Sequence, residues 1–465
     1  MSAAVLLRRP IVLPPAPCSP MSAVSTISAR LDRLTITSAH RVAIAALAFA
    51  YFFELADLNT FAFAAPGLIK AWQIPVSDVA TITSASFGGM FLGAVCGGRF
   101  ADAFGRKRGF IISILVYALF SLLNALSWDV ISLAVFRFLT GVGLSAMTII
   151  ANTYVSEFFP ANVRGKYMGR IVTIGLIGIP ATAFIARFLV PLAEWGWRLV
   201  FIWGGLGIFA LVFAARMKES PRWHLNKNEH ARAEAIVEAL EAVALAEQGS
   251  LPPPRMDGVE PPASSSAFSM LFEGRQRGRT IMLLLAWIFQ TLGFYGFVAW
   301  VPTLLVERGF SLVQSLSYTS LIAICNPLGS LIASDLVERF ERKWFIVVDG
   351  VLIAIFGVAY GLSGAPMLIV IFGALVVMTI QCMAVALYTY TPELFPTPIR
   401  SSGMGLTYGV GRLANVLGPF FVSTIFAAVG YLSVFVYIAA CWLIVVFVVG
   451  VFGPTTTGKS LEVLD

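Results

Sequence analysis

The feature that most constrains this chain is a series of long apolar runs separated by short charged or turn-rich segments. A helix that crosses the hydrocarbon core of a bilayer needs about 20 mostly apolar residues. Twelve runs meet this requirement, at about 42–66, 80–100, 109–127, 131–154, 168–190, 197–216, 280–305, 315–337, 344–362, 366–390, 402–427 and 430–452. Hydrophobic residues make up 58% of the chain and charged residues 12%, whereas soluble domains are about half apolar and a quarter charged. An ordinary soluble enzyme is therefore excluded.

The apolar runs predict an all-α membrane protein with twelve transmembrane helices. Backbone groups in lipid are satisfied only within a helix or a closed barrel, and the runs lack the alternating pattern of barrel strands. Cations gather in one set of loops, around residues 30–41, 106–108, 164–170 and 339–343, and are sparse in the other set. Because cationic loops stay inside, we expect both termini to be cytoplasmic and the protein to be multi-pass in a plasma or inner membrane.

The chain divides into five predicted parts. They are a disordered cytoplasmic tail (1–40), a six-helix bundle (41–216), a cytoplasmic linker (217–279), a second six-helix bundle (280–453) and a cytoplasmic tail (454–465). Prolines between residues 10 and 20 oppose helix in the first tail. An Ala- and Glu-rich stretch at about 227–247 predicts a helix within the linker.

The two bundles are related by a duplication with one constant offset. Charged and glycine motifs that follow the second and fourth spans recur after the eighth and tenth. The pairs Asp102 and Glu338, Arg106 and Arg342, Glu157 and Glu393, and Arg164 and Arg400 each lie 236 residues apart. One offset shared by distant motifs predicts two similar six-helix bundles in tandem. Because each bundle has an even number of spans, the two bundles have the same orientation and are related by an axis along the membrane normal.

These motifs resemble the major facilitator superfamily. The run at 98–107 reads Gly-x-x-x-Asp-x-x-Gly-Arg-Lys, and an altered copy stands at 334–343, with Glu-x-Phe-Pro loops after the fourth and tenth spans. The run Glu-Ser-Pro-Arg-Trp at 219–223 is similar to the end of the first half in the sugar and organic-ion branches. Asp57 is similar to a first-helix acid of the aromatic-acid and metabolite:proton symporters, with Glu54 where an aspartate is usual. The resemblance implies transport of a small solute.

A cytoplasmic gate is expected at the duplicated loops. Glycines permit close approach and unusual backbone conformations, and acids can meet the positive end of a neighbouring helix. The predicted gate residues are Gly98, Asp102, Gly105, Arg106, Glu157, Arg164, Glu338, Arg342, Glu393 and Arg400. The alternative is that positive loops only set the orientation, but this would need neither the acids nor the glycines.

Three charged residues lie deep within the first-half spans. Glu54 and Asp57 share one face of the first span, and a charge at mid-membrane costs about 2.5–3.5 kcal/mol. Paired carboxylates oppose each other's ionisation, and a carboxylate that can take up a proton is what proton coupling requires. We expect Asp57 to bind the proton, Glu54 to modulate it and Arg137 to pair with Asp57. The alternatives are a neutral, hydrogen-bonded acid and an arginine that reaches the outer interface.

Arg412 is the preferred anchor for an anionic substrate. It lies in the middle of the eleventh span, and its half offers no mid-depth carboxylate. A guanidinium binds a carboxylate through paired hydrogen bonds. A salt bridge to Glu54 or Asp57, or a contact to backbone carbonyls, is the alternative. Further pocket candidates are Gln290, Tyr295, Trp300, Asn326, Gln381, Tyr388 and Asn415, which would otherwise serve helix packing.

The function that these features favour is uptake of a small organic or aromatic acid together with protons. A sugar porter or uniporter, and a proton-driven efflux antiporter, are the alternatives. No nucleophile–base pair, metal cluster or phosphate loop stands out, so we expect no enzyme activity, no metal and no cofactor. The expected partners are a small-molecule substrate, protons and the lipid bilayer. Nucleic acid is not expected because the cations belong to membrane-flanking loops, and the protein is expected to be a monomer.

Overall fold

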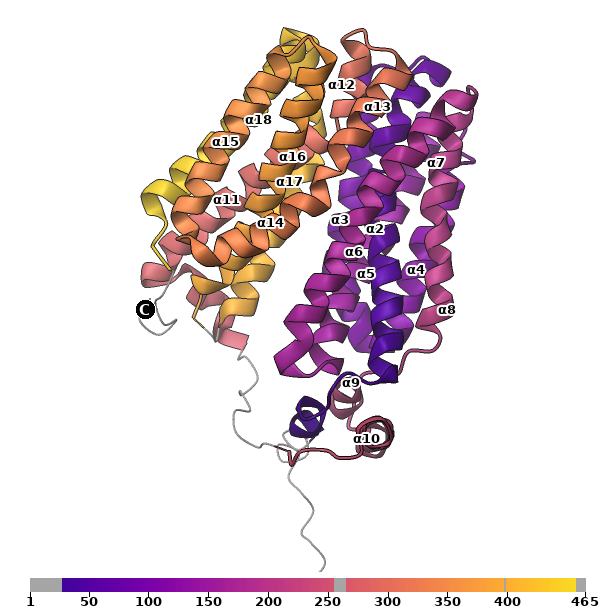
Figure 1. The fold of residues 1–465 in the computed structure, drawn as a ribbon, viewed down its shortest axis with the longest axis vertical. Coiled ribbons are helices and arrows are strands. Elements are labelled where there is room, and N and C mark those ends of the chain that lie inside the picture. The colour runs from indigo at the N-terminus through magenta and orange to yellow at the C-terminus, as the bar shows by residue number, and fades with distance from the viewer. Residues whose placement is uncertain (1–26, 255–264, 397–398, 457–465) are drawn as a thin grey trace, which may run out of the picture.

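A computed structural model describes residues 27–254, 265–396 and 399–456 of the chain. Every regular element in these ranges is a helix. Among the described residues, twelve helices are long and apolar enough to cross a membrane. They form two bundles that stand beside each other, one from each half of the chain (Figure 1). The predicted all-α architecture of two six-helix bundles is confirmed.

Six spans form the first bundle. They are α2 (Ser38–Trp72), α3 (Val76–Phe104), α4 (Arg106–Asn124), α5 (Val130–Phe158), α6 (Ala161–Leu189), and a sixth span made of α7 (Gly196–Gly205), a 3₁₀ turn (Leu206–Phe209) and α8 (Ala210–Ala214). Local chemistry fixes several ends. The Asp129 carboxylate accepts a 2.7 Å hydrogen bond from the Ser132 backbone N–H and caps α5. Gly105 has φ +103° and separates α3 from α4.

The second bundle contains two interrupted spans. Its helices are α11 (Gly274–Val298), α12 (Val301–Glu307), α13 (Leu312–Ala323), α14 (Cys325–Arg339), α15 (Arg342–Leu362), α16 (Pro366–Glu393), α17 (Arg400–Val429) and α18 (Tyr431–Phe452). The predicted runs 280–305 and 315–337 are continuous in hydropathy, but Pro302 and Pro327 follow the two breaks. Proline has no N–H for the helical ladder and clashes with the preceding turn.

Two predicted pocket residues form hydrogen bonds at the second break. Pro327 cannot donate to the carbonyl of Ala323, and the Asn326 Nδ2 donates to that carbonyl at 2.9 Å instead. The Gln381 Nε2 on α16 then donates to the Asn326 Oδ1 at 2.8 Å. Both amides are buried. Asn326 and Gln381 therefore satisfy a broken helix, which favours the helix-packing alternative for this pair.

A stripe of glycines brings α3 and α5 into close contact. Gly89, Gly93 and Gly97 recur every four residues along α3 and face the backbone of α5. A Cβ at any of the three would collide with α5 atoms. Small residues at such spacing allow helix backbones to approach closely in membranes, where van der Waals packing drives association.

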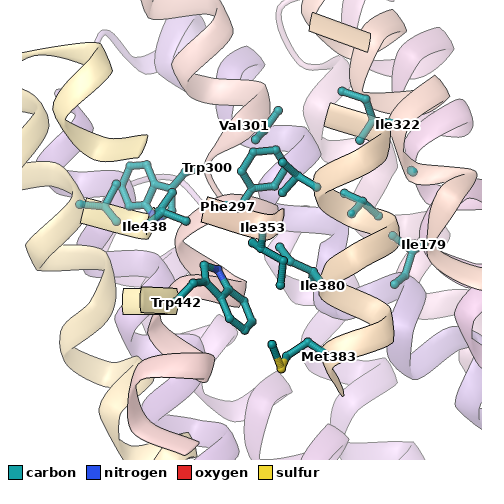
Figure 2. Packing of buried hydrophobic residues seen from close by; sticks show 14 of the residues in the cluster. Ile179, Phe297, Trp300, Val301, Ile322, Ile353, Ile380, Met383, Ile438 and Trp442 are labelled. Carbon is teal, nitrogen blue, oxygen red and sulfur yellow. The ribbon is translucent and has the colours of Figure 1, made fainter. Parts of the chain in front are cut away.

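The two bundles meet mainly at the end distal to the linker. The ribbons run close together there and diverge toward α9 (Pro221–Asn226) and α10 (His230–Gln248) (Figure 1). A buried apolar cluster spans both halves, and Figure 2 shows Ile179 of α6 with Ile322 of α13 among its members. The Ser320 Oγ on α13 also donates to the Ala183 carbonyl on α6 at 2.9 Å. These contacts close the distal end.

The prediction of a disordered tail over 1–40 is wrong for residues 27–37, which we call the N-terminal strap. Ile27, Leu31 and Leu34 are buried. Ile27 and Leu31 share one face of a helical turn at 27–32, and Leu34 follows just beyond it. They belong to a core cluster that also includes buried residues of α10. Residues 1–26 of the predicted tail lie outside the described residues. The linker helix predicted at 227–247 is present as α10.

Ion pairs hold α10 against the N-terminal strap. The Glu241 carboxylate on α10 accepts 2.6 Å contacts from both Arg30 and Arg33. Burial opposes the ionised form of Glu241, but these hydrogen bonds outweigh burial and hold its pKa below the usual range. The strap also reaches α6, because the Asp32 carboxylate accepts a 2.9 Å hydrogen bond from the Ala161 N–H. The linker helix is thereby fastened to the first bundle.

Candidate functional site

The duplicated charged motif of the first half forms an ion-pair cluster at the linker end. Arg106 lies at the start of α4 and is 5% exposed. Its guanidinium pairs with Glu157 on α5 at 2.8 Å and with Asp102 on α3 at 2.5 Å. One arginine thus joins three helices of the same bundle. Gly98, also predicted for the gate, lies on α3 one turn before Asp102, with only the Ile149 side chain near its Cβ position.

Glu219 from the linker completes this cluster. Its carboxylate accepts hydrogen bonds from the backbone N–H groups of Arg106 at 2.8 Å and of Lys107 at 3.0 Å. An anion at a helix N-terminus satisfies free N–H groups and meets the positive end of the helix dipole. A Cβ on Gly105 would meet the same carboxylate. The glycine in the motif therefore makes room for the acid from residues 219–223.

The second copy of the motif is simpler. Arg342 pairs with Glu393 at 2.9 Å, and the Arg400 Nε donates to the Phe395 carbonyl at 3.3 Å. Glu338 and Arg164 are exposed. Neither takes part in an ion pair within the part of the chain that the structure describes. Each ion pair described here for these motifs joins residues of one bundle.

Asp57 and Arg137 form a buried ion pair inside the first bundle. The Arg137 Nη1 lies 3.3 Å from the Asp57 Oδ2, and the side chains are 2% and 0% exposed. The Ser121 Oγ on α4 donates to the other carboxylate oxygen of Asp57. The Arg137 Nε donates to the Ser86 Oγ on α3 at 3.1 Å. The predicted contact between Asp57 and Arg137 is therefore present, and its role in proton binding stays a prediction.

Glu54 lies one turn from Asp57 but has different surroundings. It is 5% exposed, and its carboxylate accepts a 2.7 Å hydrogen bond from the Thr148 Oγ1 on α5. In the described structure, no ion pair within 4.0 Å joins Glu54 to Arg412 of the second bundle. Glu54 therefore has a hydroxyl partner on α5, whereas Asp57 pairs with an arginine of α5.

Arg412 is surrounded by tyrosines. Its Nε donates to the Tyr408 hydroxyl at 3.0 Å, and its Nη1 donates to the Tyr295 hydroxyl on α11 at 3.2 Å. Tyr388 on α16 contacts the Tyr408 ring at 5.8 Å between centroids and is 46% exposed. Trp287 packs edge-on against both Tyr388 and Tyr408. A cation held by neutral hydroxyls within aromatic walls can accept a carboxylate from a flat ligand.

A small pocket lies between the bundles, and Tyr295 of this group lines it. Its walls include Arg137 and Ser86 from the first bundle and Tyr295 and Val298 from the second. The cavity therefore brings the surroundings of the Asp57 ion pair and of Arg412 to one interface.

The remaining pocket candidates lie elsewhere. Trp300 is 2% exposed and belongs to the apolar cluster that spans both halves (Figure 2). Gln290 accepts a 3.1 Å hydrogen bond from the adjacent Thr291 hydroxyl and is 6% exposed. Asn415 is 1% exposed. The structure brings Tyr295 and Tyr388 to the Arg412 group but gives these three no contact with its guanidinium.

Sequence reasoning missed several partners. Tyr408 precedes Arg412 by four residues, so helical spacing alone could have identified it. Ser121 and Thr148 carried no such signal. The acids that they bind, Asp57 and Glu54, lie on another helix, and serine and threonine are common in spans. In the described ranges, no three His, Cys, Asp or Glu side chains come together in a group that could hold a metal ion.

The fold and the buried charges define a multi-pass membrane transporter. Residues 38–465 match the model of the sugar (and other) transporter family, and the chain belongs to this family within the major facilitator superfamily. It is 45% identical over 438 residues to the putative metabolite transport protein YyaJ of Bacillus subtilis, covering 94% of this chain and 97% of that protein. It is 32% identical over 437 residues to the niacin transporter NiaP of Acinetobacter baylyi, covering 93% and 98%.

The solved structure of the xylose transporter XylE from E. coli in a partially occluded inward open conformation shares the fold. The TM-score is 0.69 at 17% sequence identity, and the match covers 95% of this chain and 99% of that one. Proteins of this family and fold are transporters, which are not enzymes.

Proposed function

We propose that this transporter moves a small organic acid, of the aromatic monocarboxylate class, together with a proton by alternating access. The observation that carries the proposal is Arg412, a cation in the middle of α17 that donates hydrogen bonds to the neutral hydroxyls of Tyr295 and Tyr408. A cation within a membrane span is costly unless it has a partner or a ligand. An anionic substrate would supply the missing charge.

The aromatic surroundings support a flat substrate. Trp287, Tyr388 and Tyr408 pack around one side of the guanidinium. Aromatic walls with a few polar groups suit a planar ring that carries one carboxylate. The relative named for niacin, a ring with one carboxylate, agrees with this class. A sugar has no charge to offer Arg412, so we place the sugar porter second.

The proton would bind at Asp57. Its ion pair with Arg137 encloses both charges inside the first bundle, and protonation of Asp57 would leave Arg137 to its hydroxyl partners. Proton occupancy then changes the relative stability of the two openings, which is what coupling requires. Glu54, one helical turn from Asp57 on α2, would modulate proton binding.

The linker end would be the cytoplasmic end, with both termini on that side, because the cationic loops lie there. In this arrangement the bundles are closed at the distal end and diverge toward the cytoplasm (Figure 1). The clusters around Arg106 and Arg342 would form the gate, since each could exchange a partner in its own bundle for one across the interface. The protein would act as a monomer in a plasma or inner membrane.

Transport by the purified chain in proteoliposomes tests this proposal. We expect niacin and benzoate to accumulate when the outside is more acidic, and xylose not to accumulate. Replacing Arg412 with glutamine should abolish uptake of both acids. Uptake of xylose in preference to both acids would contradict the substrate class, and equal uptake with and without the pH gradient would contradict proton coupling.

A further inference from the structure

Tyr295 joins the Arg412 group to the opposite bundle. Its hydroxyl accepts the 3.2 Å hydrogen bond from the Arg412 Nη1. Its ring packs edge-on against Phe87 of α3, with 4.7 Å between the ring centroids. One side chain therefore touches the proposed anion site with its polar end and the first bundle with its apolar face.

Phe87 stands beside the residue that holds Arg137. Ser86, its neighbour on α3, accepts the 3.1 Å hydrogen bond from the Arg137 Nε. Arg137 in turn pairs with Asp57. Ser86, Phe87, Arg137 and Tyr295 also line the same cavity between the bundles. A continuous series of contacts therefore runs from Arg412 in one half to Asp57 in the other.

We propose that Tyr295 is the positioning residue that couples substrate binding at Arg412 to the ion pair of Asp57. A carboxylate on Arg412 competes with the Tyr295 hydroxyl for the guanidinium N–H groups. Release of that hydroxyl changes how the Tyr295 ring packs on Phe87 and α3. The shift alters the Ser86 contact of Arg137 and so biases the Asp57 ion pair. This inference rests on the proposed function, because it assumes an acid at Arg412 and a proton at Asp57.

Other charged and titratable groups surround Tyr295. Arg412 and Tyr408 of α17 act on it from its own half, and Glu54 of α2 acts on it from the other. Arg137 of α5 lines the shared cavity. A pH effect of a Tyr295 variant is therefore measured in the wild-type background and again with Glu54→Gln, so that a contribution of Glu54 is separated from one of Asp57.

Tyr408 supplies a matched control. Its hydroxyl also accepts a hydrogen bond from Arg412, but its ring packs against Trp287 and Tyr388 of the second bundle. Tyr295→Phe and Tyr408→Phe each remove one hydroxyl from the same cation. Only Tyr295→Phe removes it from the side chain that contacts α3. A second test of the same link is Phe87→Leu, which removes the ring contact and leaves the partners of Arg412 unchanged.

The experiment uses niacin with the purified full chain in proteoliposomes. Counterflow reports binding and exchange without a proton gradient, and accumulation under a pH gradient reports coupling. We expect Phe87→Leu to keep niacin counterflow within about twofold while losing about fivefold or more of the accumulation ratio, the lower range of allosteric coupling. Tyr295→Phe should change the half-saturating concentration of niacin, still carry out counterflow at saturating niacin, and show the same loss of the accumulation ratio. Tyr408→Phe should raise the half-saturating concentration of niacin and keep the accumulation ratio at saturating niacin.

Each outcome has one consequence. Retained counterflow shows that a variant is folded, so loss of accumulation then reports coupling. An accumulation ratio of Tyr295→Phe equal to wild type overturns the coupling role, and so does an equal loss in Tyr408→Phe. Because coupling along a series of contacts requires direct evidence, additive effects of Tyr295→Phe and Phe87→Leu would also overturn it. Failure of the wild-type protein to transport niacin and benzoate would instead contradict the proposed function.

Discussion

Replacing Asp57 with asparagine should destabilise the protein and uncouple it. The change removes the anion next to Arg137, which is 2% exposed. Loss of one partner of a buried ion pair costs about 3–5 kcal/mol. Arg137 keeps hydrogen bonds to the hydroxyls of Ser86 and Thr60, so we expect a loss near the lower end, about 3 kcal/mol.

A thiol-reactive dye can measure this loss in detergent. Cys382 and Cys441 are 6% and 2% exposed, so they react when the bundles unfold. We expect the midpoint of thermal unfolding to fall by several degrees in Asp57→Asn. The double variant Asp57→Asn/Arg137→Gln removes both charges and should recover much of the lost stability, because a neutral replacement of a buried pair is often tolerated.

Transport gives the second readout of Asp57→Asn. A pH difference of one unit is worth about 1.4 kcal/mol per proton, which supports about tenfold accumulation when one proton enters per substrate. We expect the wild-type protein to approach this ratio for niacin and the variant to equilibrate niacin without accumulation. Glu54→Gln is the control for stability, since the glutamine amide oxygen can still accept the hydrogen bond from Thr148 and the change should cost about 1 kcal/mol or less. Unchanged stability and full accumulation in Asp57→Asn would refute the reasoning.

Three further predictions concern other parts of the structure. Arg412→Lys should weaken niacin binding about tenfold or more in calorimetric titration, since hydrogen bonds to charged groups are worth about 1.5–3 kcal/mol and lysine lacks the planar fork of arginine; unchanged affinity would exclude the anion site. Gly105→Ala should lower the unfolding midpoint more than Gly249→Ala, because both have positive φ but only Gly105 has a side chain against its Cβ position; equal losses would contradict this contact. The pKa of the Glu241 carboxylate is lowered in the folded protein. Its stabilisation of α10 docking is therefore complete at pH values above the unfolded pKa of about 4.3. This stabilisation is lost as the pH falls through the lower pKa of the folded protein. Hydrogen exchange of α10 should therefore stay slow from neutral pH to about pH 5 and rise in stronger acid, whereas Glu241→Gln should exchange fast at neutral pH; identical profiles would show that the carboxylate does not hold α10.

The spans and the duplication could be predicted because their physical signals are local. A run such as 366–390 has almost no charge to interrupt it, and lipid permits little except a helix there. The constant spacing between Asp102 or Arg106 and the matching residue of the second half can be read from the sequence without knowing any contact in the structure. The N-terminal strap was missed because the prolines between residues 10 and 20 suggested disorder for the whole tail, although Leu31 and Leu34 carry a short helical pattern.

The site was only partly predictable, since its partners come from different helices. The pair of Asp57 and Arg137 could be predicted because both charges require compensation and their depths in the membrane differ by about 5 Å, within reach of an arginine side chain. Asn326 looked like a pocket residue from its polarity alone. Its structural role depends on the carbonyl left free by the following proline and on an amide of another helix. A polar residue within a span is therefore expected to need a hydrogen-bond partner, but its type does not tell whether that partner is a ligand or another part of the protein.

Proton flow during niacin entry tests the central claim most directly, that an organic acid and a proton cross together through one alternately opened site. A pH-sensitive dye trapped in proteoliposomes would record the internal pH after niacin is added outside, with equal starting pH on both sides. The account predicts acidification of the interior with wild-type protein, beyond that seen in protein-free liposomes or with Asp57→Asn. Niacin entry with no more acidification than in those two controls would contradict it.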